Sequence, residues 1–287
     1  MRSFVFAATL FAALFLLFAC KKETTPDKPV VEGLSVQSAS SPSGSSRESS
    51  EVLSIEEYYS EIGRKHNESL TILHEQFYYN DKASPEELAL PIIETSLDYV
   101  KKFSNASAYF DDGTYIDRAK VDVIETLLNN KPVDLSGCSD QLMEHYTKLR
   151  DLVLTSEYEE AEKLTALVDG YYFETYREFK DSVDLISFTA FAGTLKASLQ
   201  FWFADGRTER SGTSAVMARR PPDKKGIAVA DGVGALKGAW EFGRLGFALG
   251  GGAGAFVVGA TGAIFEGAIA SAEAGLLDRI GSWTGWW

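Results

Sequence analysis

The chain has 287 residues, of which 45% are hydrophobic and 24% charged, with a formal net charge of −13. This length can supply one or two domains with an ordinary core. Because the chain is acidic overall, its composition argues against nucleic acid as a partner.

The first twenty residues form a short apolar segment that ends in a cysteine. Arg2 supplies a positive charge, residues 4–19 carry none, and the small Ala19 directly precedes Cys20. Sixteen residues in a helix cover about 24 Å, which is less than the ~30 Å of a bilayer's hydrocarbon core. The segment therefore favours a cleaved signal over a membrane-spanning helix.

The motif Leu17-Phe18-Ala19-Cys20 resembles the lipobox of bacterial lipoproteins. The resemblance implies that residues 1–19 are a signal peptide, and that Cys20 carries a diacylglycerol thioether and a further acyl group such as palmitate on its amino terminus. Two or three acyl chains make a permanent anchor. Lys21 stands where an inner-membrane retention signal would have Asp. The resemblance therefore favours the outer membrane, on its periplasmic or surface face, over the inner membrane.

Residues 20–53 are expected to form a disordered, serine-rich tether. Residues 21–53 hold nine serines and three prolines but few aliphatic residues, so they cannot bury enough apolar surface to offset chain entropy. A flexible chain of this length has a span of roughly 30 Å. With Cys20 lipidated, Cys138 is the one cysteine left. We interpret it as a small, partly buried residue without a nucleophilic role.

Residues 54–205 predict an acidic, antiparallel helical bundle in an all-α fold. Ser54-Ile55-Glu56-Glu57 is a capping box, and Ser84-Pro85 starts a second helix. We expect Pro91 to divide that helix and Asp169-Gly170 to end a later one. Apolar residues at heptad-like spacing predict one long helix over residues 172–197. A further helix is expected over residues 116–127.

The predicted bundle contains no catalytic motif, and we expect neither enzymatic activity, nor a cofactor, nor a metal. His66 and His74 are eight residues apart on one predicted helix, which is poor geometry for sharing a metal. We interpret them as solvated or hydrogen-bonded surface residues. A set of aromatic residues predicts core packing, with an apolar groove as the alternative: Phe188, Phe191, Phe201, Trp202 and Phe203.

The C-terminal third begins with a basic linker, residues 206–225, which precedes a glycine-rich segment, residues 226–287. In this segment 21 consecutive residues, 245–265, carry no charge, and seven of them are glycine. Gly246, Gly250 and Gly254 recur at intervals of four. The segment resembles the glycine zippers of bacterial envelope proteins and the glycine-rich tails of small membrane-active bacteriocins.

Three arrangements of the glycine-rich segment remain open: one membrane-spanning helix, a helical hairpin turning at Gly250-Gly251-Gly252, and burial against the bundle. The membrane arrangements are favoured by three tryptophans near the end of the segment, Trp283, Trp286 and Trp287, because tryptophan prefers the membrane–water interface. We expect these three tryptophans, together with Gly246, Gly250 and Gly254, to be membrane-contact or helix-packing residues. Interior glycines cost a helix about 1 kcal/mol each relative to alanine, so close backbone contact must compensate.

The function expected from these features is that of a lipid-anchored envelope lipoprotein without enzymatic activity, acting as a structural or interaction module. Its expected partner is a membrane, through the lipid on Cys20 and also through the C-terminal segment; a protein partner is not identified by the sequence. The alternative is a membrane-active toxin, or bacteriocin-like antagonism factor, that uses the glycine-rich segment.

Overall fold

The computed structural model describes residues 54–78, 85–102, 133–204 and 223–284, and within these ranges it contains helices and no strand. The predicted all-α class is confirmed. Four predicted features lie outside the described residues: the signal and tether (1–53), the helix over 116–127 and most of the basic linker.

Side-chain caps mark the starts of three described helices, α2, α5 and α7. Ser54 caps α2 as predicted, because its hydroxyl accepts from the Glu57 amide at 3.2 Å and its own amide donates to the Glu57 carboxylate at 2.6 Å. The elements in chain order are α2 (Ile55–Leu73), the π turn η1 (His74–Tyr78), α3 (Pro85–Lys101), α5 (Asp140–Thr155), α6 (Ala161–Thr175), the 3-10 turn η3 (Tyr176–Glu178), α7 (Ser182–Phe203) and α8 (Lys224–Thr284).

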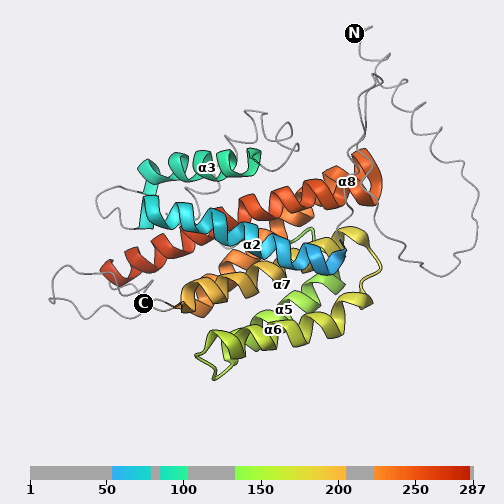
Figure 1. Ribbon diagram of the computed structural model, residues 1–287, viewed down its shortest axis with the longest axis horizontal. Coiled ribbons are helices and arrows are strands. Elements are labelled where there is room, and N and C mark those ends of the chain that lie inside the picture. The colour runs from blue at the N-terminus through green and yellow to red at the C-terminus, as the bar shows by residue number, and fades with distance from the viewer. Residues whose placement is uncertain (1–53, 79–84, 103–132, 205–222, 285–287) are drawn as a thin grey trace, which may run out of the picture. The chain divides into compact units, whose positions relative to one another are not determined.

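Helices α7 and α8 form the centre of the described fold, and the other helices pack around them (Figure 1). Side chains are buried on every side of α7. One core cluster joins α2 and α3 to both arms of α8, around Ile62, Ile93 and Phe265. A second cluster joins α5 and α6 to α7 and to the start of α8, around Leu149 and Phe191. The glycine-rich segment therefore shares its core with the bundle.

Helix α8 is a hairpin. Gly251 has φ of +62°, the left-handed region that glycine adopts without strain, and the chain reverses there. Residues 224–250 and 252–284 then run antiparallel, as shown by the contact of Gly246 with Gly254 and of Gly238 with Gly262. The turn lies within the predicted Gly250-Gly251-Gly252, and both arms are buried against the bundle. The helical hairpin and burial against the bundle, which the sequence left open as separate arrangements, thus occur together.

The prediction that Pro91 divides its helix is wrong. Pro91 lies inside α3, which continues from Pro85 to Lys101. Leu88, Ile92 and Leu97 on either side of the proline are buried in one core cluster. Burial of a continuous apolar stripe outweighs the lost backbone hydrogen bond, since tertiary contacts routinely override local propensity.

Two further boundaries differ from the prediction. Helix α6 passes through Gly170 and ends at Thr175, because Val168 and Tyr172 continue its buried face across the glycine. The helix expected over 172–197 is interrupted at η3 and restarts at Ser182. Asp181 sets this restart, because its carboxylate accepts from the amides of residues 183 and 184 at 2.8 and 3.0 Å.

Candidate functional site

The two arms of α8 meet through glycines that admit no side chain. A Cβ atom added to Gly238 would lie 2.1 Å from the carbonyl oxygen of Gly262, and one added to Gly246 would lie 2.2 Å from that of Gly254. These distances are shorter than any van der Waals contact. The glycines therefore allow the two backbones to touch, which explains why a helix rich in glycine is stable here.

The structure places the predicted packing residues in different settings. Gly246 and Gly254 face each other from opposite arms, and Gly250 immediately precedes the turn residue Gly251. Trp283 lies in the last turn of α8, and its side chain is outside the described set. Trp286 and Trp287 lie outside the described residues, as does the lipidation residue Cys20.

A buried polar centre fixes the first arm of α8 to α2 and α7. The Asp231 carboxylate accepts from Ser198 Oγ in a short hydrogen bond and from Trp202 Nε1 at 3.3 Å. His66 Nε2 lies 3.5 Å from the same carboxylate oxygen. Asp231 and His66 are completely buried, and the second carboxylate oxygen of Asp231 has no hydrogen-bond partner. Three helices thus converge on one carboxylate.

The expectation that both histidines lie at the surface is wrong for His66. It has no exposed surface, whereas His74 is partly buried and lies edge-on to the rings of Phe201 and Trp202. The two histidines belong to different environments and do not share a site. In the described part of the chain, no group of three or more His, Cys, Asp or Glu residues could hold a metal.

The four central aromatic residues are core, as predicted. Phe188 and Phe191 are completely buried and pack in the cluster that joins α5, α6 and α7. Phe201 and Trp202 are buried with Leu70 and Ile227 in a small third cluster, and Phe203 packs against both clusters. These side chains fill the interior, which leaves the alternative of an apolar groove there without support.

A groove of about 500 Å³ lies between α2 and α7, where the two helices approach closely. A Cβ atom on Gly63 would lie 2.6 Å from the carbonyl oxygen of Gly193. Both cations that line this groove are paired: Lys196 with Asp169 at 2.8 Å, and Arg64 with Glu61 and Glu68. The groove therefore offers no unpaired cation to an anionic ligand.

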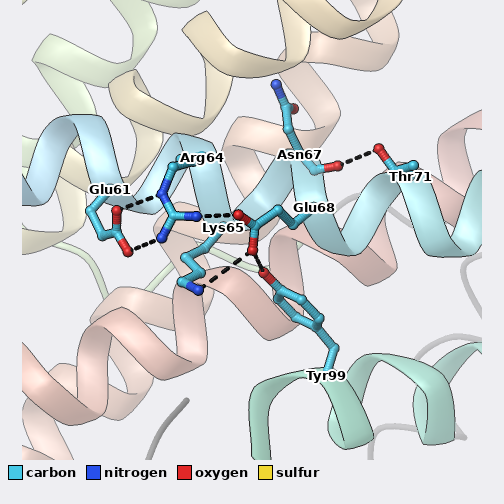
Figure 2. A network of polar contacts seen from close by, with 7 residues as sticks. All are labelled: Glu61, Arg64, Lys65, Asn67, Glu68, Thr71 and Tyr99. Atoms are coloured by element: carbon cyan, nitrogen blue, oxygen red, sulfur yellow. Dashed lines mark hydrogen bonds and ion pairs between the residues drawn. The ribbon is translucent and has the colours of Figure 1, made fainter. Parts of the chain in front are cut away.

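The charged wall of this groove continues as a network along α2 (Figure 2). Arg64 bridges Glu61 and Glu68, and Lys65 lies 3.4 Å from Glu68. Glu68 also accepts from the hydroxyl of Tyr99 on α3 at 2.5 Å. This hydrogen bond is the first cause of the lowered pKa of Glu68, followed by the nearby Lys65 and Arg64 cations. The network therefore joins α2 to α3.

Cys138 is partly buried just before α5, as the sequence suggested. Burial raises the pKa of its thiol to about 11, and the negative charges of Asp184, Glu241 and Asp134 act in the same direction. A thiol with a raised pKa is a poor nucleophile at neutral pH, because little of it is thiolate.

The turn of the α8 hairpin is uncharged and exposes apolar side chains. Leu245 is 43% exposed and Phe247 is 49% exposed. Directly before them, the Arg244 guanidinium lies 4.7 Å from the centre of the Trp240 ring. From Leu245 around the turn to Phe265, no residue carries a charge.

The described residues include one stretch, Gly254–Ala272, that is long and apolar enough to cross a membrane, with a mean hydropathy of 1.5. Within the fold 78% of it is buried. A core helix of a soluble protein has the same length and composition, so this stretch alone does not decide between the two.

No protein-family model, curated protein or solved structure matches this chain. The function is therefore inferred from the sequence features and contacts described above.

Proposed function

We propose that the protein is a lipid-anchored lipoprotein of the bacterial envelope, held in the outer membrane, that acts without catalysis as a structural or protein-binding module. The observation that carries this proposal is the motif Leu17-Phe18-Ala19-Cys20 behind a charged amino terminus and a short apolar run. The serine-rich residues 20–53 then serve as a tether between the lipid and the helical body.

The glycine-rich hairpin has an internal role in this proposal. Its first arm carries Asp231, which hydrogen-bonds to Ser198 and Trp202 inside the bundle. Moving this arm into lipid would break those bonds and leave a carboxylate in hydrocarbon, which is costly. The two arms of the α8 hairpin therefore serve as part of the core of the helical body, and Cys20 supplies the permanent attachment to the membrane.

The lipid anchor is tested by expressing the full-length chain in a Gram-negative host and measuring the mass of the amino-terminal peptide of the mature protein. We expect a peptide that begins at Cys20 and carries diacylglycerol and acyl groups, in a protein that fractionates with the outer membrane. Cys20→Ala should lose both properties. Cys138→Ala, which removes the other cysteine, is the matched control and should keep them. An unlipidated wild-type chain would refute the proposal.

The 21 uncharged residues that turn at Gly251 favour one alternative, a membrane-active toxin. A toxin must release the hairpin from the bundle and permeabilise a target membrane. The mature full chain, added to dye-loaded phosphatidylcholine vesicles over a range of concentrations, separates the two functions. We expect no release of dye, and release that rises with concentration would favour the toxin.

A further inference from the structure

The turn of the α8 hairpin and the first residue of α2 lie at the same end of the described fold. Tyr58, four residues into α2, packs on Phe256, five residues past Gly251, with ring centres 4.5 Å apart. Ile55 packs against the core cluster that contains Phe256. The tether expected over residues 20–53 therefore joins the helical body beside the hairpin turn.

This end of the fold has an apolar tip. Among the described side chains near the turn, Leu245 and Phe247 are large and exposed, and Ala248 beside them is also exposed. The stacked pair of Trp240 and Arg244 follows one to two helical turns behind Phe247. Aromatic rings and long cationic side chains of this kind suit the headgroup layer that borders an apolar interior.

The opposite end of the fold provides residues for a matched comparison. Lys225 at the start of α8 donates to the carbonyl oxygen of Ser156 at 3.0 Å and to Glu159 at 2.9 Å. Since 26 residues separate Lys225 from Gly251, the first arm places these two ends about 40 Å apart. Tyr158, Leu152 and Leu154 are exposed near this far end.

We propose that the hairpin turn, with Leu245 and Phe247 at its surface, rests in the headgroup layer of the bilayer to which Cys20 anchors the chain. This inference depends on the proposed lipid anchor, because the tether, with an r.m.s. span of roughly 30 Å, then keeps the tip near the lipid surface. Such a short reach gives the tip a high effective concentration at the bilayer. The proposed contact is superficial, and the arms stay in the bundle.

The charges around the tip indicate which lipid surface it fits. Acidic side chains lie in the first turns of the three helices that start near this end, namely Glu56 and Glu57 on α2, Asp140 on α5 and Asp184 on α7. They would be repelled by anionic headgroups, and they outnumber the cations Arg177, beside Glu56, and Arg244 on the tip. The tip therefore suits a neutral or zwitterionic surface, and anionic lipid should not strengthen the contact.

The test places a photoreactive benzoylphenylalanine at Phe247 in the full lipidated chain, reconstituted into phosphatidylcholine vesicles. The matched control carries the same group at Tyr158, which is an aromatic residue of nearly equal exposure at the far end. We expect about tenfold more lipid crosslinking from position 247 than from 158, as for a shallowly buried apolar contact. Leu245→Ser should reduce the crosslinking at 247, whereas Leu154→Ser should not.

Other outcomes overturn the inference in distinguishable ways. If crosslinking is equally low at 247 and 158 in a protein that floats with the vesicles, the chain is anchored by its lipid but the tip does not contact the bilayer. Crosslinks from 247 to a second copy of the chain would make the tip a protein interface. Lipid crosslinks from the same group at Val257, inside the second arm, would show insertion of the hairpin in place of surface contact.

If Cys20 is not lipidated, the proposed function fails, but the tip contact can still be measured. The chain without residues 1–19, in the Cys138→Ala variant, is coupled through the Cys20 thiol to a maleimide lipid, and the crosslinking at 247 and 158 is repeated. A preference for 247 supports the tip contact by itself. Equal crosslinking refutes it.

Discussion

His66 on α2 and Asp231 on α8 lie 3.5 Å apart, and neither has any exposed surface. The carboxylate of Asp231 is also the acceptor for Ser198 and Trp202 on α7. One buried side chain therefore holds together the helix that follows the tether, the central helix and the hairpin.

Replacing Asp231 with alanine should destabilise the fold strongly. Ser198 and Trp202 would lose their acceptor in a fully buried site, and we expect a loss of about 2–4 kcal/mol in the free energy of unfolding. Asp231→Asn keeps an acceptor oxygen and should cost less. Urea unfolding followed by circular dichroism measures both variants. If Asp231→Ala unfolds at the wild-type midpoint, the polar centre does not contribute to stability.

The close contact between the hairpin arms predicts opposite effects for one substitution at two glycines. Gly238→Ala would place a methyl group against the backbone of Gly262, so we expect a loss of roughly 1–3 kcal/mol in the free energy of unfolding from overpacking. Gly170→Ala on α6 meets no atom within 4 Å. It should stabilise the protein by about 0.5–1 kcal/mol, because alanine has the higher helix propensity.

Thermal unfolding of Gly238→Ala and Gly170→Ala side by side checks the sign of both effects. The comparison is internally controlled, since the chemical change is identical. If Gly238→Ala stabilises the protein as Gly170→Ala does, or leaves its stability unchanged, the hairpin arms do not touch through their glycines.

The hydrogen bond from Tyr99 to Glu68 should make the α2–α3 contact depend on pH. It lowers the pKa of Glu68 in the folded state, so its contribution is present above the unfolded pKa, about 4.3, and is lost as the pH falls through the lower folded value. Glu68 is partly exposed, so the contribution is about 0.5–1 kcal/mol after screening.

We therefore expect Tyr99→Phe to be less stable than the wild type at pH 7 by this amount and nearly equal to it at pH 2.5. Urea unfolding at the two pH values measures the difference. Thr95→Val on the same helix removes a hydroxyl that contacts Gln76 and leaves Glu68 untouched, so it is the control. A constant difference between Tyr99→Phe and the wild type at both pH values would contradict the prediction.

Local sequence signals located the starts of α2 and α3, and they failed where tertiary packing decides. The capping residues of Ser54-Ile55-Glu56-Glu57 form the predicted hydrogen bonds, because both partners lie within one turn. Pro91 and Gly170 suggested breaks that the structure does not contain, since buried residues on both sides carry each helix through. The cap at Asp181 was missed because the apolar stripe appeared continuous across it.

The hairpin contact and the buried polar centre around Asp231 were harder to predict from the sequence. Gly250-Gly251-Gly252 indicated a possible turn, and the spacing of the glycines indicated close helix contact. The pairing of His66 with Asp231 could not be predicted, because 165 positions separate them and no local pattern joins them. The one available signal was Asp231 itself, because its neighbours over residues 226–236 are all small or apolar, and an aspartate among them requires a buried partner.

The surroundings of Cys138 predict slow reaction with thiol reagents. Because burial raises the pKa of the thiol to about 11, the thiolate fraction at pH 8 is far smaller than that of a free cysteine with a pKa of about 8.5. We expect alkylation by iodoacetamide at pH 8 to be about a hundredfold slower in the folded chain than in urea. The chain without residues 1–19 and with Cys20→Ala isolates this thiol. Raising the pH from 8 to 10 should accelerate the alkylation of the folded protein about tenfold per pH unit, since the thiolate fraction rises tenfold per unit below the pKa. A folded-state rate equal to that in urea would show that Cys138 is an accessible thiol of ordinary pKa.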